Sequence, residues 1–246
     1  MSDPTRPGPN FVDLTTAAVA QTTKFGALTA VTDLVGHLRW RLGPPEEGDL
    51  VGAELAADPA ELAARVAVTA AGRGSDDPQV LGSLWWQAYA YRVAGTTLAA
   101  WVVGGSAPDV SAPGTAVGVA RARPASLVVD PAAGELTALD EVLERLFAGH
   151  LDQVAVALKD RHALGTSLLW GDVVAGVASA LGAVGTAEGS PPLRYRVDLV
   201  TASLPHGIGR LGAWAEGSWS FRRRTCCLWW KTTASAGALC EDCSLR

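Results

Sequence analysis

The residues of this sequence best suited to chemistry are its four cysteines, which all lie within the last 21 of 246 residues. Cys226 and Cys227 are adjacent, and twelve residues later Cys240 and Cys243 form a C-x-x-C pair. Thiolates are soft ligands that suit zinc or an iron–sulfur cluster. Four thiols gathered at one end of the chain therefore predict one four-coordinate site.

The spacing of the two cysteine pairs distinguishes the possible occupants of this site. Structural zinc sites usually take their ligands in pairs with two to four residues between the thiols. The second pair obeys this rule, whereas the adjacent first pair does not. A [2Fe–2S] cluster has two metal atoms and ligand positions that are more spread out, which accommodates an adjacent pair more easily. The spacing favours the cluster, while zinc, disulfides and free thiols stay open as alternatives.

The sequence around the cysteines is similar to that of a known family. The basic stretch Arg222-Arg223-Arg224 leads into Cys226-Cys227-Leu228, and Cys240-Glu241-Asp242-Cys243 follows near the end of the chain. This arrangement resembles the FhuF-like ferric siderophore reductases, in which four such thiols hold a [2Fe–2S] cluster. The close resemblance covers residues 222–246, and a looser one is the Leu169-Trp170-Gly171 segment.

The resemblance implies a ligand set, an activity and a cofactor. All four cysteines would hold a [2Fe–2S] cluster that passes one electron to Fe(III) in a siderophore, so that Fe(II) is released. The gap between the pairs is twelve residues here and usually ten in the family, and Glu241 and Ser244 stand where the family often has Gly and Pro. Because backbone N–H bonds to sulfur tune the reduction potential, we do not carry over the family's potential.

The residues beside the cysteines predict how a substrate would be bound. Basic side chains there would attract an anionic ferric chelate or an acidic electron donor, even on a protein of net charge −5. Indole rings could shield the cluster from water or stack on a flat chelate. The residues expected to bind substrate are Arg222, Arg223, Arg224, Lys231, Trp229 and Trp230. The alternative is a solvated basic face with indoles that simply pack.

Two other functions fit the same cysteines. A non-enzymatic binding protein could use zinc to close its C-terminal loop, and an iron–sulfur sensor could report oxygen or iron. The stretch 207–212 matches G-x-G-x-x-G, but the cysteines begin 14 residues later and leave no room for a dinucleotide-binding βαβ unit. We therefore expect electrons to come from an external donor such as a ferredoxin or a reduced flavin system.

Composition and charge exclude further classes. With 48% apolar and 18% charged residues the chain is expected to be globular, and its net negative charge argues against nucleic-acid binding. The histidines lack metal-ligand spacing and are expected in surface or capping roles; they are His37, His150, His162 and His206.

The sequence also bears on where the protein resides. Residues 1–10 are polar and Pro-rich, unlike a signal peptide. No apolar run is expected to reach the ~18–20 residues of a transmembrane helix, and Val173–Gly185 is expected to form a buried helix. We therefore expect a cytoplasmic protein, whose thiols stay reduced and available to a metal.

The elements that must position the cysteines are mainly helices. Asp58-Pro59 and Gly72 are start and stop signals for one helix. Apolar residues at helical spacing predict further helices over 79–103, 136–148, 150–162 and 167–182. Strand patterns predict a hairpin over 115–129 and a strand over 195–201. Stretches 104–114 and 182–192 are typical of linkers.

The fold class predicted is α+β and mainly helical: a helical body with a small antiparallel sheet and a C-terminal iron–sulfur cluster loop. The predicted organisation is a disordered N-terminus over 1–10, an N-terminal helical part over 11–104, a mixed α/β part over 105–221, and a [2Fe–2S] binding segment over 222–246.

Overall fold

A computed structural model describes most of the chain, and helices make up 59% of it. The described residues are 25–70, 73–111, 114–121, 123–188, 191–205, 213–215 and 218–246. The predicted class, α+β and mainly helical, is confirmed. The N-terminus predicted to be disordered lies outside the described residues.

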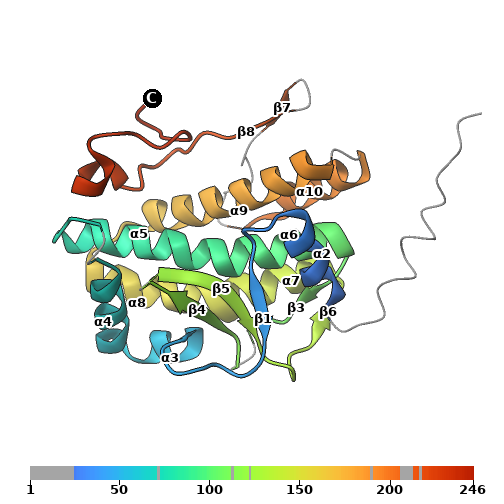
Figure 1. The fold of residues 1–246 in the computed structure, drawn as a ribbon, viewed down its shortest axis with the longest axis horizontal. Coiled ribbons are helices and arrows are strands. Elements are labelled where there is room, and N and C mark those ends of the chain that lie inside the picture. The colour runs from blue at the N-terminus through green and yellow to red at the C-terminus, as the bar shows by residue number, and fades with distance from the viewer. Residues whose placement is uncertain are drawn as a thin grey trace, which may run out of the picture.

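The first half of the described chain builds a long central helix and its neighbours (Figure 1). Its elements are α2 (Gly26–Leu34), β1 (Trp40–Leu42), β2 (Leu50–Val51), α3 (Gly52–Ala57), α4 (Pro59–Ala70), α5 (Pro78–Ala90), α6 (Thr96–Gly104) and β3 (Ala107–Pro108). Asp58 accepts hydrogen bonds from the first N–H groups of α4, which confirms the predicted start. A π turn, η1 (Tyr91–Gly95), joins α5 to α6, so the helix predicted over 79–103 is continuous.

The second half adds a hairpin and two long helical runs. Its elements are β4 (Ala116–Ala120), β5 (Arg123–Val129), β6 (Glu135–Leu136), α7 (Leu139–Leu146), α8 (Asp152–His162), α9 (Thr166–Glu188), α10 (Pro191–Ser203), β7 (Ala213–Ala215), β8 (Ser218–Ser220), and the 3-10 turns η3 (Trp229–Lys231) and η4 (Thr233–Ser235). A second π turn, η2 (Phe147–Leu151), merges the helices predicted over 136–148 and 150–162 into one run.

The main sheet is mixed, where an antiparallel sheet was expected. Its strand order is β1-β5-β4-β2, and β4 and β5 form the predicted antiparallel hairpin. Strand β1 pairs in parallel with β5, with Trp40 opposite Leu127. The predicted linker over 104–114 is wrong in part, because β3 lies within it and pairs with β6.

Two further expectations are wrong at α9 and α10. The predicted strand over 195–201 is helical, because Leu193, Val197 and Val200 recur at helical spacing and are buried. The linker predicted from residue 182 begins too early, because α9 continues to Glu188 and buries Val184.

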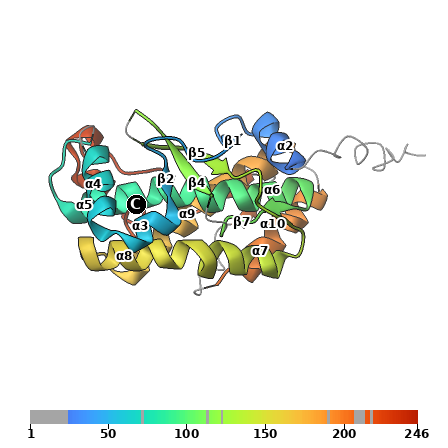
Figure 2. The ribbon, with the colours of Figure 1, turned by 90° about the horizontal axis from the view of Figure 1, so that it is seen from below.

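Helix α5 runs through the middle of the molecule (Figure 1). It contacts α9 and the C-terminal segment on one side and β5 on the other. Seen from below, the run of α7 and α8 lies on the opposite side of α5 from the hairpin (Figure 2). One core extends from Phe25 to Leu204, so the predicted parts 11–104 and 105–221 share it.

Helix α9 contains a longer apolar stretch than was predicted from the sequence. Over Thr166–Thr186 its mean hydropathy is 1.6, so by length and composition alone this helix could cross a membrane. However, 72% of that stretch is buried inside the protein, as in the core helix of a globular domain. This is weak evidence for a membrane span and agrees with the buried helix expected at Val173–Gly185.

Two histidines are buried, although surface or capping roles were expected. His150 Nδ1 donates to the Val110 carbonyl at 2.8 Å, and the Tyr89 hydroxyl lies 2.7 Å from its Nε2. His162 is also buried, beside Gly82 of α5. His206 and the G-x-G-x-x-G stretch over 207–212 lie outside the described residues.

Candidate metal centre

The C-terminal segment, residues 218–246, lies across α9 and α5 (Figure 1). Strand β8 pairs with β7, and beyond it the segment contains only the short turns η3 and η4. Leu228, directly after the first cysteine pair, adopts a left-handed conformation with φ 64°. With so little regular structure, the segment depends on specific side-chain contacts to hold its cysteines in place.

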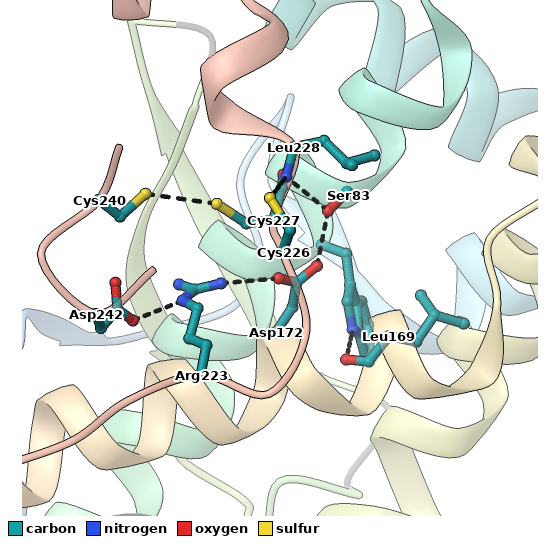
Figure 3. Close-up of polar contacts among 10 residues, drawn as sticks. Ser83, Leu169, Asp172, Arg223, Cys226, Cys227, Leu228, Cys240 and Asp242 are labelled. Carbon is teal, nitrogen blue, oxygen red and sulfur yellow. Dashed lines mark hydrogen bonds and ion pairs between the residues drawn. The ribbon is translucent and has the colours of Figure 1, made fainter. Parts of the chain in front are cut away.

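The segment brings one cysteine of each pair together, and Figure 3 shows Cys240 facing Cys227. The Sγ atoms of Cys227 and Cys240 are 3.5 Å apart, so the two pairs meet across the twelve-residue gap. The charges of Cys227 and Cys243 both act on Cys226. Cys227 and Cys243 are buried, Cys226 and Cys240 are half-buried, and none forms a disulfide.

Backbone donors face sulfurs of both cysteine pairs. The N–H of Leu228 donates to Cys226 Sγ and the N–H of Leu245 donates to Cys243 Sγ, each at 3.4 Å. A backbone hydrogen bond from Trp229 also acts on Cys227. Such bonds are typical of thiolate ligands, because they stabilise charge on sulfur.

Burial keeps the thiols of Cys226 and Cys227 protonated when no metal holds them. It raises the pKa of Cys227 to about 12, although the nearby Arg223 charge opposes the shift. Burial is also the main reason why the pKa of Cys226 is raised. A metal that bound here would have to release these protons, so its affinity would increase with pH.

The twelve-residue gap between the pairs is folded. Thr232 and Ser235 are buried in it, and the Thr232 hydroxyl donates to the Trp229 carbonyl at 2.9 Å. The gap is also attached to the body, because Thr233 N–H donates to the Gly74 carbonyl at 3.1 Å. The loop that joins the two cysteine pairs is therefore anchored to the helical body.

A buried ion-pair network attaches the segment to α9 (Figure 3). The guanidinium of Arg223 contacts Asp172 on α9 at 3.1 Å and Asp242, inside the C-x-x-C pair, at 2.5 Å. The Ser83 hydroxyl of α5 lies 2.9 Å from an Asp172 carboxylate oxygen and 3.2 Å from the Cys227 carbonyl oxygen, so it can donate to either. Helices α5 and α9, which are distant from the cysteines in sequence, are thereby linked to both cysteine pairs.

Burial and charge act in opposite directions within this network. Burial raises the pKa of Asp172 to about 7, against the opposing effect of Arg223. Burial also disfavours the charge of Arg223, but Asp172, Cys227 and Asp242 outweigh it and raise its pKa. Arg223 therefore stays charged.

Ser83, Asp172 and Asp242 belong to this candidate site but were not predicted from the sequence. One signal was available, because Asp172 directly follows the Leu169-Trp170-Gly171 segment. Gly171 lets the cysteine segment come close: a Cβ there would lie 1.8 Å from Thr225 Oγ1. Trp86 Nε1 donates to the Leu169 carbonyl at 2.8 Å and fixes the same turn of α9 to α5.

A cleft of about 740 Å³ opens beside the cysteines, and Cys240 is part of its wall. The cleft lies between α5, η1, α9 and the C-terminal segment. Of the six residues expected to bind substrate, Arg223 and Trp229 line it. Arg222, Arg224, Trp230 and Lys231 are exposed and do not line this cleft, so their contact with substrate stays a prediction.

The candidate donor atoms at this site are four sulfurs, the atom type that binds both zinc ions and iron–sulfur clusters. Within the described part of the chain, no three His, Cys, Asp or Glu side chains gather closely enough to hold one metal ion. The 3.5 Å between Cys227 and Cys240 is near the ~3.8 Å expected for two thiolates on one tetrahedral metal. Cys227 and Cys240 are thus the two thiols placed for a shared metal in this structure.

No protein-family model matches this chain, and a search of curated proteins finds no match either. Any function must therefore be argued from the geometry of the site itself.

Proposed function

We propose that this protein is a ferric siderophore reductase, in which Cys226, Cys227, Cys240 and Cys243 hold a [2Fe–2S] cluster that passes one electron to chelated Fe(III). The observation that carries this proposal is that Cys240 lines the cleft and lies 3.5 Å from Cys227, so the two cysteine pairs meet beside it. The resemblance of residues 222–246 to the FhuF-like reductases supports it.

A [2Fe–2S] cluster, when bound, supplies one electron at a time. The ferric ion of the chelate gains that electron and becomes Fe(II), which carries less charge and binds hard oxygen donors less strongly. The metal is then released with the chelator intact. The electron is replaced by an external donor, a ferredoxin or a reduced flavin, and we propose that this takes place in the cytoplasm.

The chain's own residues have three tasks in this reaction. Arg223, Asp172 and Asp242 hold the two cysteine pairs in register on α9. The backbone N–H groups of Leu228 and Leu245 stabilise negative charge on sulfur. The cleft brings the chelate up to the side of the site that carries Cys240.

The first test is the metal content of anaerobically purified protein. About two irons and two sulfides per chain, with a one-electron EPR signal after dithionite reduction, are expected from the four-thiolate ligand set. Zinc without sulfide would reject the reductase and support a binding protein with a structural metal. A cluster without turnover of ferric chelates would support a sensor.

The second test uses a matched pair of variants in the same segment. Cys227→Ser removes one ligand and is expected to abolish both the cluster signal and the reduction of ferric chelates. Ser244→Ala changes a residue next to Cys243 that is not a ligand, and it is expected to preserve both. If Cys227→Ser protein reduced ferric chelates as fast as wild type, the cluster could not be the electron donor.

A further inference from the structure

Two arginines that lie far from the cysteines in sequence line the cleft, Arg73 and Arg92. The guanidinium of Arg73 lies 5.3 Å from the centroid of the Trp229 ring. Arg92 stacks over Tyr91 at 5.0 Å and donates to the His37 carbonyl at 2.6 Å. Within the described residues, neither arginine makes an ion pair with a carboxylate. Both positive charges are therefore free to meet an anion.

Further arginines stand close to this pair. Burial and then the charge of Arg123 lower the pKa of Arg73. Burial is also the largest cause of the lowered pKa of Arg92, and Arg39 adds to it. Half-buried like charges without counter-ions repel one another, and a bound anion would relieve this repulsion.

The cysteine side of the cleft has a different charge balance. Arg223 is neutralised there by Asp172 and Asp242. Glu241 also lines the cleft on that side and is exposed. The positive charges of the cleft without a carboxylate partner therefore come from the helical body, through Arg73 beside Trp229 and Arg92 on η1, while the C-terminal segment supplies the carboxylates of Glu241 and Asp242.

The shape of the cleft suits a ligand with flat rings. Aromatic side chains from η1 and the C-terminal segment line it: Tyr91, Trp219, Phe221 and Trp229. Small residues of α5 and α9 form another part of its lining and leave it open: Ala88, Ala175, Gly176 and Ala178. Its volume of about 740 Å³ lies within the range of ligand pockets.

We infer that this cleft selects its chelate by charge, taking net-anionic ferric chelates with aromatic oxygen donors, of the tris-catecholate class, through Arg73 and Arg92. This inference rests on the proposed function, which is the reason to expect a ferric chelate as the ligand. The arginines contact the charged oxygens, and the aromatic side chains stack on the donor rings. A chelate with a free ammonium group meets the same arginines and is disfavoured.

Gallium(III) chelates test this selectivity without any electron transfer, because Ga(III) is not reduced under these conditions. Titration of the purified protein, followed by tryptophan fluorescence and calorimetry, would compare a gallium tris-catecholate with a gallium trihydroxamate that carries a free ammonium. We expect the anionic chelate to bind at least about tenfold more tightly, with an advantage that shrinks at high salt.

Three single substitutions locate the effect. Arg73→Gln and Arg92→Gln are each expected to weaken binding of the tris-catecholate about tenfold, as for loss of a charge-assisted contact, and to change binding of the ammonium chelate little. Arg145→Gln removes the same charge from exposed Arg145 on α7, outside the cleft, and is expected to leave both affinities unchanged. Circular dichroism would establish that each variant is folded.

A bulky substitution provides an independent check on the location. Ala88→Trp places an indole in the cleft from α5 and is expected to reduce binding of both chelates. The inference is overturned if the two chelates bind equally well, if Arg92→Gln does not weaken the anionic one, or if Ala88→Trp has no effect. If the purified protein holds no cluster but still prefers the anionic chelate, the proposed reductase is rejected and the cleft is an anion-binding site.

Discussion

At the scale of single residues, Arg223 determines where the cysteines lie. Its side chain is only 3% exposed, and its two carboxylate partners come from α9 and from the C-x-x-C pair. A buried ion pair adds little net stability over a well-packed apolar pair, but removal of one partner leaves an unpaired buried charge. The network therefore serves mainly to fix the position of the segment.

Substitution of Arg223 should show this directly. Arg223→Gln is expected to lower the free energy of unfolding by about 3 kcal/mol and to reduce the iron retained on purification, because Asp172 is left buried without its counter-charge. Arg222→Gln is the matched control, since Arg222 is exposed and should change stability by less than about 0.5 kcal/mol. Thermal unfolding and iron analysis would measure both; equal effects would contradict the assignment.

His150 should make stability depend on pH. The Val110 carbonyl can only accept, so Nδ1 carries the proton and Nε2 accepts from Tyr89. Burial lowers the pKa of His150 in the folded protein, so the unfolded chain binds more protons. The contribution of neutral His150 to the free energy of unfolding is present above about pH 6.5. It is lost as pH falls, at up to about 1.4 kcal/mol per pH unit.

This expectation can be checked by denaturant unfolding between pH 5 and pH 8. His150→Gln should reduce the gain in stability as pH rises from 5 to 6.5, because it removes one buried group whose pKa is lowered; the opposite contribution of Asp172, whose pKa is raised, is present in both proteins. His37→Gln, at an exposed position, should reduce that gain much less. An unchanged slope in the His150 variant would show that His150 does not titrate on unfolding.

At the scale of elements, the first turns of α9 form the surface on which the cysteine segment rests. Gly171 presents bare backbone to Thr225, and Asp172 receives Arg223 one residue later. Trp86 of α5 holds the same turn through the Leu169 carbonyl. Two packed helices thereby prepare a docking surface for a segment that has almost no regular structure of its own.

A methyl group at Gly171 should disturb the site although it favours the helix. Gly171→Ala would gain about 0.5–1 kcal/mol in helix propensity, but its Cβ would lie 1.8 Å from Thr225 Oγ1 and displace the residue before Cys226. We expect an altered EPR signal and lower iron content. Gly134→Ala, where open space surrounds the Cβ, should alter neither. A normal EPR signal in Gly171→Ala would mean that Thr225 moves without the cysteines.

At the scale of the whole molecule, a well-packed helical body carries a peripheral segment that is held by few contacts. The core extends through residues 25–204 and includes no cysteine. The segment is attached through Arg223, Thr225 and the contact of Thr233 with Gly74. Such a segment can open locally while the body stays folded.

Removal of the proposed cluster should therefore affect the segment and spare the body. Metal-depleted protein is expected to keep its helical circular dichroism, while amide exchange over 222–246 becomes faster than in α5 and α9, because metal binding contributes folding energy only where the ligands lie. Hydrogen exchange before and after reconstitution with iron and sulfide would measure this. Uniformly faster exchange through the core would contradict it.

The sequence by itself determined the parts that depend on local patterns. The cysteine spacing predicted which segment carries the candidate site, and apolar periodicity predicted the helical runs of α5–α6, α7–α8 and α9. Both signals lie within short stretches of chain, because ligand pairs and amphipathic helices are local features. The same local reasoning misassigned α10, whose alternating residues 195–201 resemble a strand until Leu193 is included.

Only the tertiary structure decided which distant residues meet. Ser83, Asp172 and Asp242 converge near the cysteines, and Arg73 and Arg92 reach the cleft from elements more than a hundred residues earlier than the cysteines. The parallel pairing of β1 with β5 could not be predicted from the sequence either, because no local pattern encodes it. Such contacts depend on how whole helices and strands pack, which periodicity within one segment does not specify.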